Sequence, residues 1–320
     1  MINVDLFLNE LSLHGQFANL VEFRESIRRV MKIREISRRH QRSIYCHRRF
    51  ASCHVTTSER MAAAVKALPL NEQRAVMAWL SHHGPFWDDD RQHDGGDWYE
   101  HGGEIVTDTS VGEAAYCRLH GIERGLISLQ PSKFLHDPVR VKHLSESGER
   151  TLVDLRNFWE PDLIETFFTA APPPLISWTA LESLSTSRFE NLRFSRNAFE
   201  PLRTQPFRQS IAERILARLA TLQDMKECFN KEGTRTGEGH ILYQQYFTGD
   251  KGWFSDSSPT EKKEFKQELT FPHPDIHGES LFCTWHGKVK SPQYRIHFSW
   301  PITALDPVYV VYIGPKITKR

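Results

Sequence analysis

Residues 294–300 read YRIHFSW, and residues 308–314 read VYVVYIG. In the first stretch the polar side chains of Arg295 and His297 alternate with aromatic and aliphatic ones. An alternation with period two is typical of a β-strand that packs one face and exposes the other. A further alternating stretch, residues 281–290, precedes them, and the links between the three are short. The sequence therefore predicts an antiparallel sheet of neighbouring strands near the C-terminal end.

The open face of this predicted sheet is basic. It gathers side chains that contact phosphate or exchange a proton near neutral pH, namely His286, Lys288, Lys290, Arg295, His297, Tyr309 or Tyr312, and Lys316. Residues 281–320 hold six Lys or Arg against one Asp, a local net charge of +5, so the other 280 residues of a chain with net charge +1 sum to −4. This asymmetry predicts a polyanionic partner, and the alternative is an ordinary solubilising surface.

The packed face of the predicted sheet is large and aromatic, so it needs a helical layer against it. Residues 207–230 carry an apolar stripe at helical spacing and are the expected layer. Three consecutive prolines at 172–174 favour an extended connector. The predicted fold class is α+β. It comprises a mainly helical N-terminal domain with a small mixed element over 1–170, a Pro-rich connector over 171–206 and a helix-plus-antiparallel-sheet domain over 207–320.

Within the N-terminal domain, apolar periodicity predicts helices over residues 16–42, 57–67, 70–82 and 110–120. Short runs of β-branched and aromatic residues predict strands over 43–50, 103–107 and 125–129. The helix between the last two strands suggests a β-α-β element with a parallel pair. Residues 130–150 are polar, and we expect them to be irregular.

A family resemblance appears in the C-terminal stretches. Tyr294-Arg295-Ile296-His297-Phe298-Ser299-Trp300, followed by Val310-Val311-Tyr312-Ile313-Gly314, resembles the sheet core of RelE/HigB-type toxins. The resemblance covers residues 207–320, and residues 233–280 have no counterpart in the family pattern. Members of that family place a helical hairpin before an antiparallel sheet and are usually metal-independent endoribonucleases that cut mRNA, often on the ribosome. A related branch of the same fold inhibits gyrase and cuts no RNA. The whole chain has the look of a bacterial toxin or phage-defence protein.

The resemblance implies general acid–base cleavage of RNA, in which the 2′-oxygen attacks the adjacent phosphate. The catalytic residues would then be His286, Lys288, Arg295, His297 and Tyr312. The residues that hold nucleic acid would be Lys288, Lys290, Arg295, Lys316, Lys319 and Arg320. No cofactor is expected. The expected partner is RNA or the ribosome.

Other readings of the function stay open, and the sequence leaves it uncertain whether the chain is an enzyme. The chain could be a non-catalytic component of a bacterial defence or toxin–antitoxin system that binds nucleic acid or a protein encoded nearby. It could also be a metal-dependent hydrolase centred on residues 82–104. That segment is dense in metal-capable side chains, namely His82, His83, Asp88, Asp89, Asp90, His93, Asp94, Asp97, Glu100, His101 and Glu104.

Two further clusters have less specific patterns. The repeated pair Cys46-His47 and Cys53-His54 suggests a zinc site. On a strand, however, Cys46 and His47 would point to opposite faces. Residues 24–49 hold ten Lys or Arg against two Glu and could bind nucleic acid. We expect these arginines to pair instead with the acidic loop at 88–104.

The composition indicates in which cellular compartment the protein is expected. The five cysteines are widely scattered, which predicts reduced thiols and a cytoplasmic protein. No uncharged apolar run approaches the ~18 residues of a membrane helix, and residues 1–17 lack the features of a secretory signal. No membrane association is expected. Gly102-Gly103 and the glycine-rich stretch 233–239 are not followed by the Lys-Ser or Lys-Thr of a phosphate loop.

Overall fold

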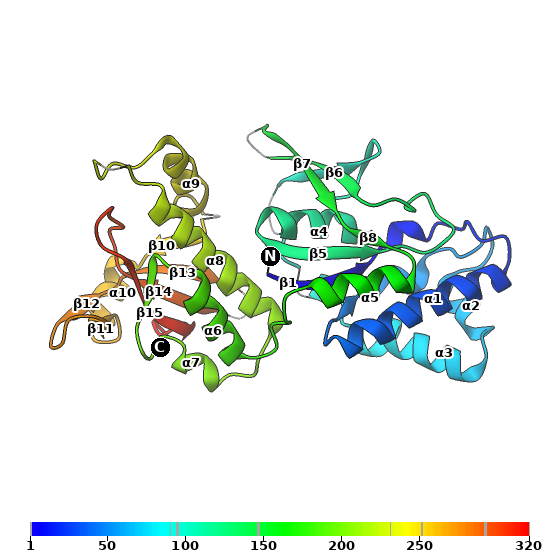
Figure 1. The fold of residues 1–320 in the computed structure, drawn as a ribbon, viewed down its shortest axis with the longest axis horizontal. Helices are drawn as coiled ribbons and strands as arrows, with labels where there is room; N and C mark the ends of the chain where they lie inside the picture. The colour runs from blue at the N-terminus through cyan, green and yellow to red at the C-terminus, as the bar shows by residue number, and fades with distance from the viewer. Residues whose placement is uncertain are drawn as a thin grey trace. The chain divides into compact units, whose positions relative to one another are not determined.

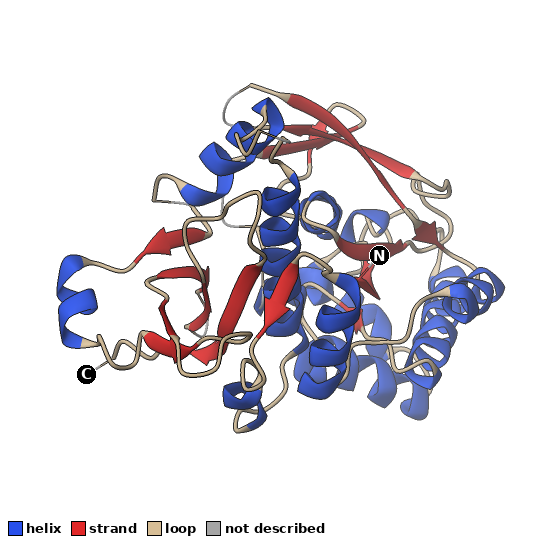
Figure 2. Ribbon diagram, turned by 60° about the vertical axis from the view of Figure 1, so that its left-hand side comes forward, coloured by secondary structure: helices blue, strands red, loops and turns tan. Residues whose placement is uncertain are grey.

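The computed structural model describes residues 2–89, 91–93, 96–145, 148–230, 232–250, 252–290 and 293–319. The chain divides into two compact units, Met1–Pro174 (unit 1) and Leu175–Arg320 (unit 2). Both units combine helices with strands (Figures 1 and 2), and unit 2 contains an antiparallel sheet, so the predicted α+β class is confirmed. Within the described part of the chain, no helix is long and apolar enough to cross a membrane.

Unit 1 is built on a parallel sheet with the strand order β2-β1-β5-β8. The strands are β1 (Ile2–Leu8), β2 (Ile44–Tyr45), β5 (Ile122–Ile127) and β8 (Asn157–Phe158). Leu6 and Leu8 belong to one apolar core, and Phe7 between them belongs to another. Most of this sheet was not predicted, because a strand buried on both faces shows no alternation in its sequence.

Helices cover both faces of this sheet. The core around Leu6 includes side chains of α1 (Leu20–Arg39), α2 (Met61–Lys66), α3 (Leu70–Met77) and α5 (Pro161–Ala170). The core around Phe7 includes α4 (Ser110–Leu119). The predicted strand 43–50 is limited to β2, because Arg48–Ser52 forms a 3-10 turn.

A second sheet of unit 1 is antiparallel, has the order β4-β3-β6-β7 and packs on α4. Its strands are β3 (Trp98–His101), β4 (Glu104–Ile105), β6 (Val139–Leu144) and β7 (Arg150–Leu155). The predicted parallel pair of 103–107 with 125–129 is wrong, because β4 pairs with β3 while β5 lies in the parallel sheet. The expected irregularity of 130–150 holds for 130–138 but is wrong for β6, where Val139 and Val141 are buried while Arg140 and Lys142 are exposed.

Unit 2 contains a mixed sheet with the order β10-β13-β14-β15-β9. Its strands are β9 (Leu192–Phe194), β10 (Phe254–Asp256), β13 (Trp285–Val289), β14 (Tyr294–Phe298) and β15 (Val308–Pro315). As predicted, β13, β14 and β15 are consecutive antiparallel neighbours. The predicted helical layer is α8 (Gln209–Glu227), which packs on this sheet (Figure 1) and buries Ile211, Ile215, Leu219, Leu222 and Met225.

Other parts of unit 2 differ from the expectation. The stretch 281–290 is not one strand, because β12 (Ser280–Phe282) pairs with β11 (Thr270–Pro272) in a hairpin of its own, before β13 begins. The expected turn at Ser291 and Pro292 lies outside the described residues. The segment 171–206, expected as a connector, holds α6 (Trp178–Arg188), β9 and α7 (Glu200–Arg203), because Trp178, Leu181 and Leu202 are buried. The remaining helices are α9 (Gly237–Phe247) and α10 (Pro259–Glu264).

We predict that Gly112→Ala destabilises unit 1 by about 1–3 kcal/mol. A Cβ at Gly112 in α4 would lie 2.2 Å from the carbonyl oxygen of Val106 and 2.8 Å from that of Thr107, and backbone atoms cannot rotate away as a side chain can. Urea unfolding measures the effect. Gly237→Ala in α9 is the control, because a Cβ there has no atom within 4 Å. Equal midpoints for wild type and Gly112→Ala would contradict this packing.

Candidate nucleic-acid interface

The five residues expected to be catalytic lie on one face of the β13-β14-β15 sheet. The register pairs His286 with His297, Lys288 with Arg295, and His297 with Tyr312. Side chains of directly opposed residues lie on the same face of a sheet, with Cβ atoms about 5 Å apart. The structure therefore brings these side chains together, and we call this group the Lys288 face.

The histidines of the Lys288 face are covered while Lys288 and Arg295 are half-buried, which corrects the expectation of a fully solvent-exposed surface. His286 is 7% exposed and His297 is 1% exposed. The β11–β12 hairpin contributes the cover, because the ring of Phe271 lies 5.9 Å from that of His297 and 6.2 Å from that of Tyr312. Alternation along β14 showed that these residues share a face, but it did not show what lies over that face.

Burial changes the proton chemistry of both histidines. It lowers the pKa of His286 to about 3 and that of His297 to about 4, and neighbouring positive charge adds to the effect at both. Nδ1 of His297 lies 3.0 Å from the carbonyl oxygen of Cys283, the geometry of a donated hydrogen bond. Both rings are therefore neutral at neutral pH, and the proton-transfer role that the sequence suggests stays a prediction that their burial argues against.

Tyr312 is also engaged within the sheet. Its hydroxyl donates to the carbonyl oxygen of Pro315 at 2.6 Å, and burial raises the pKa of the phenol to about 12. A phenol that is held by a backbone oxygen and resists ionisation is a poor general base at neutral pH.

The cations of the Lys288 face are its most unusual feature. Lys288 and Arg295 are half-buried, and neither makes an ion pair with any described residue. Burial lowers the pKa of Lys288, with a further contribution from the charges of Lys290 and Arg295. Burial also lowers the pKa of Arg295, whose Nη1 donates to the carbonyl oxygen of Tyr294 at 2.9 Å while its Nε is buried without a partner. An anion beside these two side chains would offset the free-energy cost of burying each positive charge.

The other cations expected to hold nucleic acid have different surroundings. Lys316 is committed to an ion pair with Glu261 at 2.9 Å, so its charge is already balanced. Lys290 and Lys319 are exposed. Arg320 lies outside the described residues.

The acidic segment 82–104 does not assemble a metal centre from its described residues. No group of three or more His, Cys, Asp or Glu within ligand reach of one ion occurs in the described part of the chain, which bears equally on the two Cys-His pairs. Several of the acids pair with cations or His instead, as in Arg48–Asp89, Lys133–Glu104, Lys142–Glu100 and His143–Asp97. Asp90, Asp94 and the side chain of His82 are outside the described residues.

The basic segment 24–49 pairs mainly with partners that the sequence did not suggest. Arg24 and Arg28 share Glu72, at 2.9 and 2.7 Å. Arg39 pairs with Glu165 in α5. Of the ion pairs made by this segment, the one with the acidic loop is Arg48–Asp89, so the expected pairing with 88–104 is mostly wrong. The reason is tertiary: α3 and α5 lie beside α1, whereas the loop lies beside the second sheet.

No family model, curated protein or solved structure matches this chain. Its function is therefore argued from its own geometry.

One titratable group in unit 1 was missed from the sequence. Glu113 in α4 is fully buried, and burial raises the pKa of its carboxyl group to about 7. Its oxygens accept hydrogen bonds from the backbone N–H groups of Gln92 and His93, which ties the segment before β3 to the helix. A carboxylate among the small and apolar residues of 110–119 was the available signal.

We predict that unit 2 loses stability as the pH falls from 6.5 towards 4. The pKa values of His286 and His297 are lower in the folded state than the ordinary 6.5, so the unfolded chain binds more protons in this window. Each unit of pKa difference is worth about 1.4 kcal/mol. Urea unfolding across this pH range measures the slope. The slope should become smaller in His297→Gln and stay unchanged in the exposed control His240→Gln. A wild-type slope retained in His297→Gln would contradict the role of this burial.

We predict the opposite sign for unit 1. The pKa of Glu113 is about 7 in the folded state against 4.5 for a free carboxyl group, so the folded chain binds the extra proton between these values. The contribution of Glu113 to stability is therefore present at low pH and is lost as the pH rises to 7. Urea unfolding of unit 1 at several pH values measures this pH dependence, and Glu113→Gln should remove it. Persistence of the dependence in Glu113→Gln would show that another group carries it.

Proposed function

We propose that this protein binds single-stranded RNA through its phosphate backbone at the Lys288 face, without using the two histidines to cleave it. The observation that carries the proposal is the adjacency of Lys288 and Arg295, two half-buried cations on neighbouring strands that make no ion pair with any described residue. The exposed Lys290, next along the same strand edge, extends the positive surface towards solvent.

The electrostatics favour a bound anion. Two like charges at 4 Å repel by about 1 kcal/mol in water and by about 4 kcal/mol at the lower effective dielectric near a protein surface. The lowered pKa values of Lys288 and Arg295 have burial as their main cause, and positive neighbours add to the effect at Lys288. A phosphate group bound between the two side chains would turn repulsion into two charge-assisted hydrogen bonds. Phosphates that repeat along a strand would let Lys290 engage the next one.

The expected neutrality of His286 and His297 separates binding from cleavage. A histidine acts as a general acid in its doubly protonated, charged form, and these two rings take up that form only at acidic pH. Binding therefore has more support than the endoribonuclease reading. The role of the chain in a toxin or defence system stays a prediction, to be tested by growth of cells that express it.

We predict that Lys288→Ala and Arg295→Ala each weaken binding of a fluorescent single-stranded RNA 16-mer by about tenfold at low salt, because each loses one charge-assisted contact. The slope of log K against log salt should fall by about 0.7 for each phosphate contact removed. Arg196→Ala is the control, because Arg196 is an exposed cation of the same unit whose side chain makes no hydrogen bond or ion pair with a described residue. If all three variants bind as wild type does, the Lys288 face is not the binding site.

The same samples test cleavage. The RNA should remain intact at neutral pH with and without EDTA. Cleavage by wild type that is lost in His286→Gln or His297→Gln would overturn the non-catalytic proposal in favour of a nuclease. Cleavage that only EDTA stops would favour a metal-dependent site elsewhere.

A further inference from the structure

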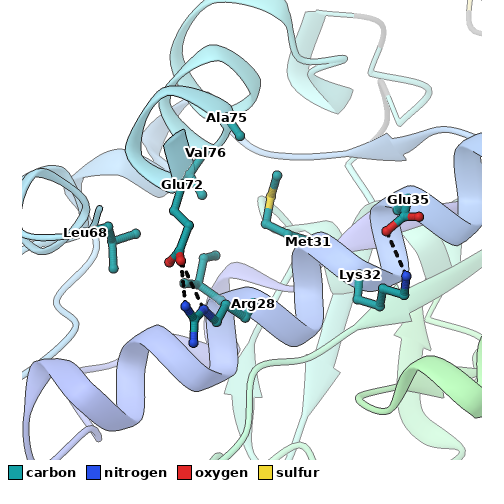
Figure 3. Close-up of a pocket in the computed structure, with 9 residues that line it drawn as sticks. Arg28, Met31, Lys32, Glu35, Leu68, Glu72, Ala75 and Val76 are labelled. Atoms are coloured by element: carbon teal, nitrogen blue, oxygen red, sulfur yellow. Dashed lines mark hydrogen bonds and ion pairs between the residues drawn. The ribbon is translucent and has the colours of Figure 1, made fainter. Parts of the chain in front are cut away.

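A groove runs along α1 in unit 1 and is distinct from the Lys288 face. It consists of two adjoining hollows of about 240 and 500 Å³, which share Met31, Glu35 and Ala75. Figure 3 shows the smaller hollow, where α3 faces α1. We call the two hollows together the α1–α3 groove.

The two ends of the α1–α3 groove differ in chemistry. The smaller hollow has an apolar lining from Ile27, Met31, Leu68 and Val76. Its charged rim is balanced internally, because Arg28 pairs with Glu72 and Lys32 pairs with Glu35, as the dashed lines in Figure 3 mark. The larger hollow is mainly cationic and contains Arg34, Arg38 and Arg39 beside Glu35.

The positive charge of the cationic end is only partly compensated. Arg39 pairs with Glu165 at 2.9 Å. Arg34 and Arg38 make no ion pair with any residue in the described ranges. Arg38 is exposed, while Arg34 lies against the ring of Trp79, with its guanidinium carbon 5.1 Å from the ring centroid. Two arginines one helical turn apart on α1 therefore have no ion-pair partner among the described residues, and Glu35 in the same hollow is paired with Lys32.

We propose that the α1–α3 groove binds an acidic amphipathic helix of a protein partner. Helices bind such grooves through apolar side chains spaced three and four residues apart. From Ile27 to Arg39 the groove follows α1 for about 18 Å, the length of a partner helix of about three turns. The partner places aliphatic side chains over Met31 and Ala75, because Ile27, Leu68 and Val76 at the floor of the hollow are almost fully buried. It places Asp or Glu opposite Arg34 and Arg38.

The size and composition of the groove select this occupant. The apolar hollow of about 240 Å³ is smaller than the roughly 300–1,000 Å³ of sites that enclose a drug-sized ligand. It suits a few side chains delivered by a larger chain. A nucleic acid would use the arginines but would gain nothing from the apolar side chains of Met31 and Ala75, whereas an acidic amphipathic helix uses both ends.

A display library of helical peptides, selected against the full-length protein, tests the proposal. The selected peptides should be acidic and amphipathic. Met31→Ala should weaken their binding by about tenfold, because it removes an apolar contact at the centre of the groove. Arg38→Gln should weaken binding about threefold and reduce its salt dependence. Lys66→Gln is the control, because Lys66 is an exposed cation of α2 outside the groove. Thermal melting of each variant checks that the fold is retained.

Three outcomes would overturn the proposal. The selected peptides could carry no excess of acidic residues. They could bind the folded Met31→Ala and Arg38→Gln variants as tightly as wild type. Single-stranded RNA could bind unit 1 with a loss in Arg38→Gln and none in Met31→Ala, which would make the cationic end a nucleic-acid site. None of these outcomes depends on whether the Lys288 face binds RNA.

Discussion

The burial of β14 on both faces is the constraint on which the chemistry of unit 2 depends. Tyr294, Ile296 and Phe298 are buried in the sheet that α8 covers. Because successive side chains of a strand point to opposite faces, Arg295 and His297 must then point away from α8. On that side the β11–β12 hairpin places Phe271 beside His297. A register that buries the aromatic side chains thus also forces a cation and a histidine into partial or full burial.

This burial explains why the residues of the Lys288 face suit anion binding better than acid–base catalysis. Burial penalises the charged form of a titratable group. A histidine can avoid the penalty by remaining neutral, and so His286 and His297 lose their value as proton carriers near neutral pH. Lys and Arg start from ordinary pKa values far above that of histidine. Burial lowers the pKa of Lys288 and of Arg295 because it makes their charged forms costly. The enclosure that weakens an acid–base mechanism therefore strengthens the attraction for an anion.

Local periodicity accounts for what could be predicted from the sequence. The alternation in 294–300 gave the shared face of Arg295 and His297, and the helical stripe from Ile211 to Met225 gave α8. The hairpin that covers the face could not be found in this way, because β11 and β12 have three residues each and a strand that short shows no reliable period. The parallel sheet of unit 1 escaped for a related reason. β2 and β8 have two residues each, and β1 is buried towards both of its faces, with Asp5 on the same face as Phe7.

Ion pairing is the other feature that could not be predicted from the sequence. It determines which cations remain without an ion-pair partner. Arg24 and Arg28 share Glu72 although about 45 residues separate them in the chain, and only the packing of α3 beside α1 makes that pair. An exposed pair of this kind is worth about 0–1 kcal/mol, so it contributes little to stability. Its larger effect is on recognition. Once Glu72, Glu165 and Glu261 are each engaged by a cation, Arg34 with Arg38 in unit 1 and Lys288 with Arg295 in unit 2 are adjacent cations that make no ion pair with a described residue. The surroundings then separate the two pairs. Arg34 and Arg38 adjoin an apolar hollow that can bind aliphatic side chains. Lys288 and Arg295 lie opposite each other on two paired strands, where their polar face can bind a phosphate backbone.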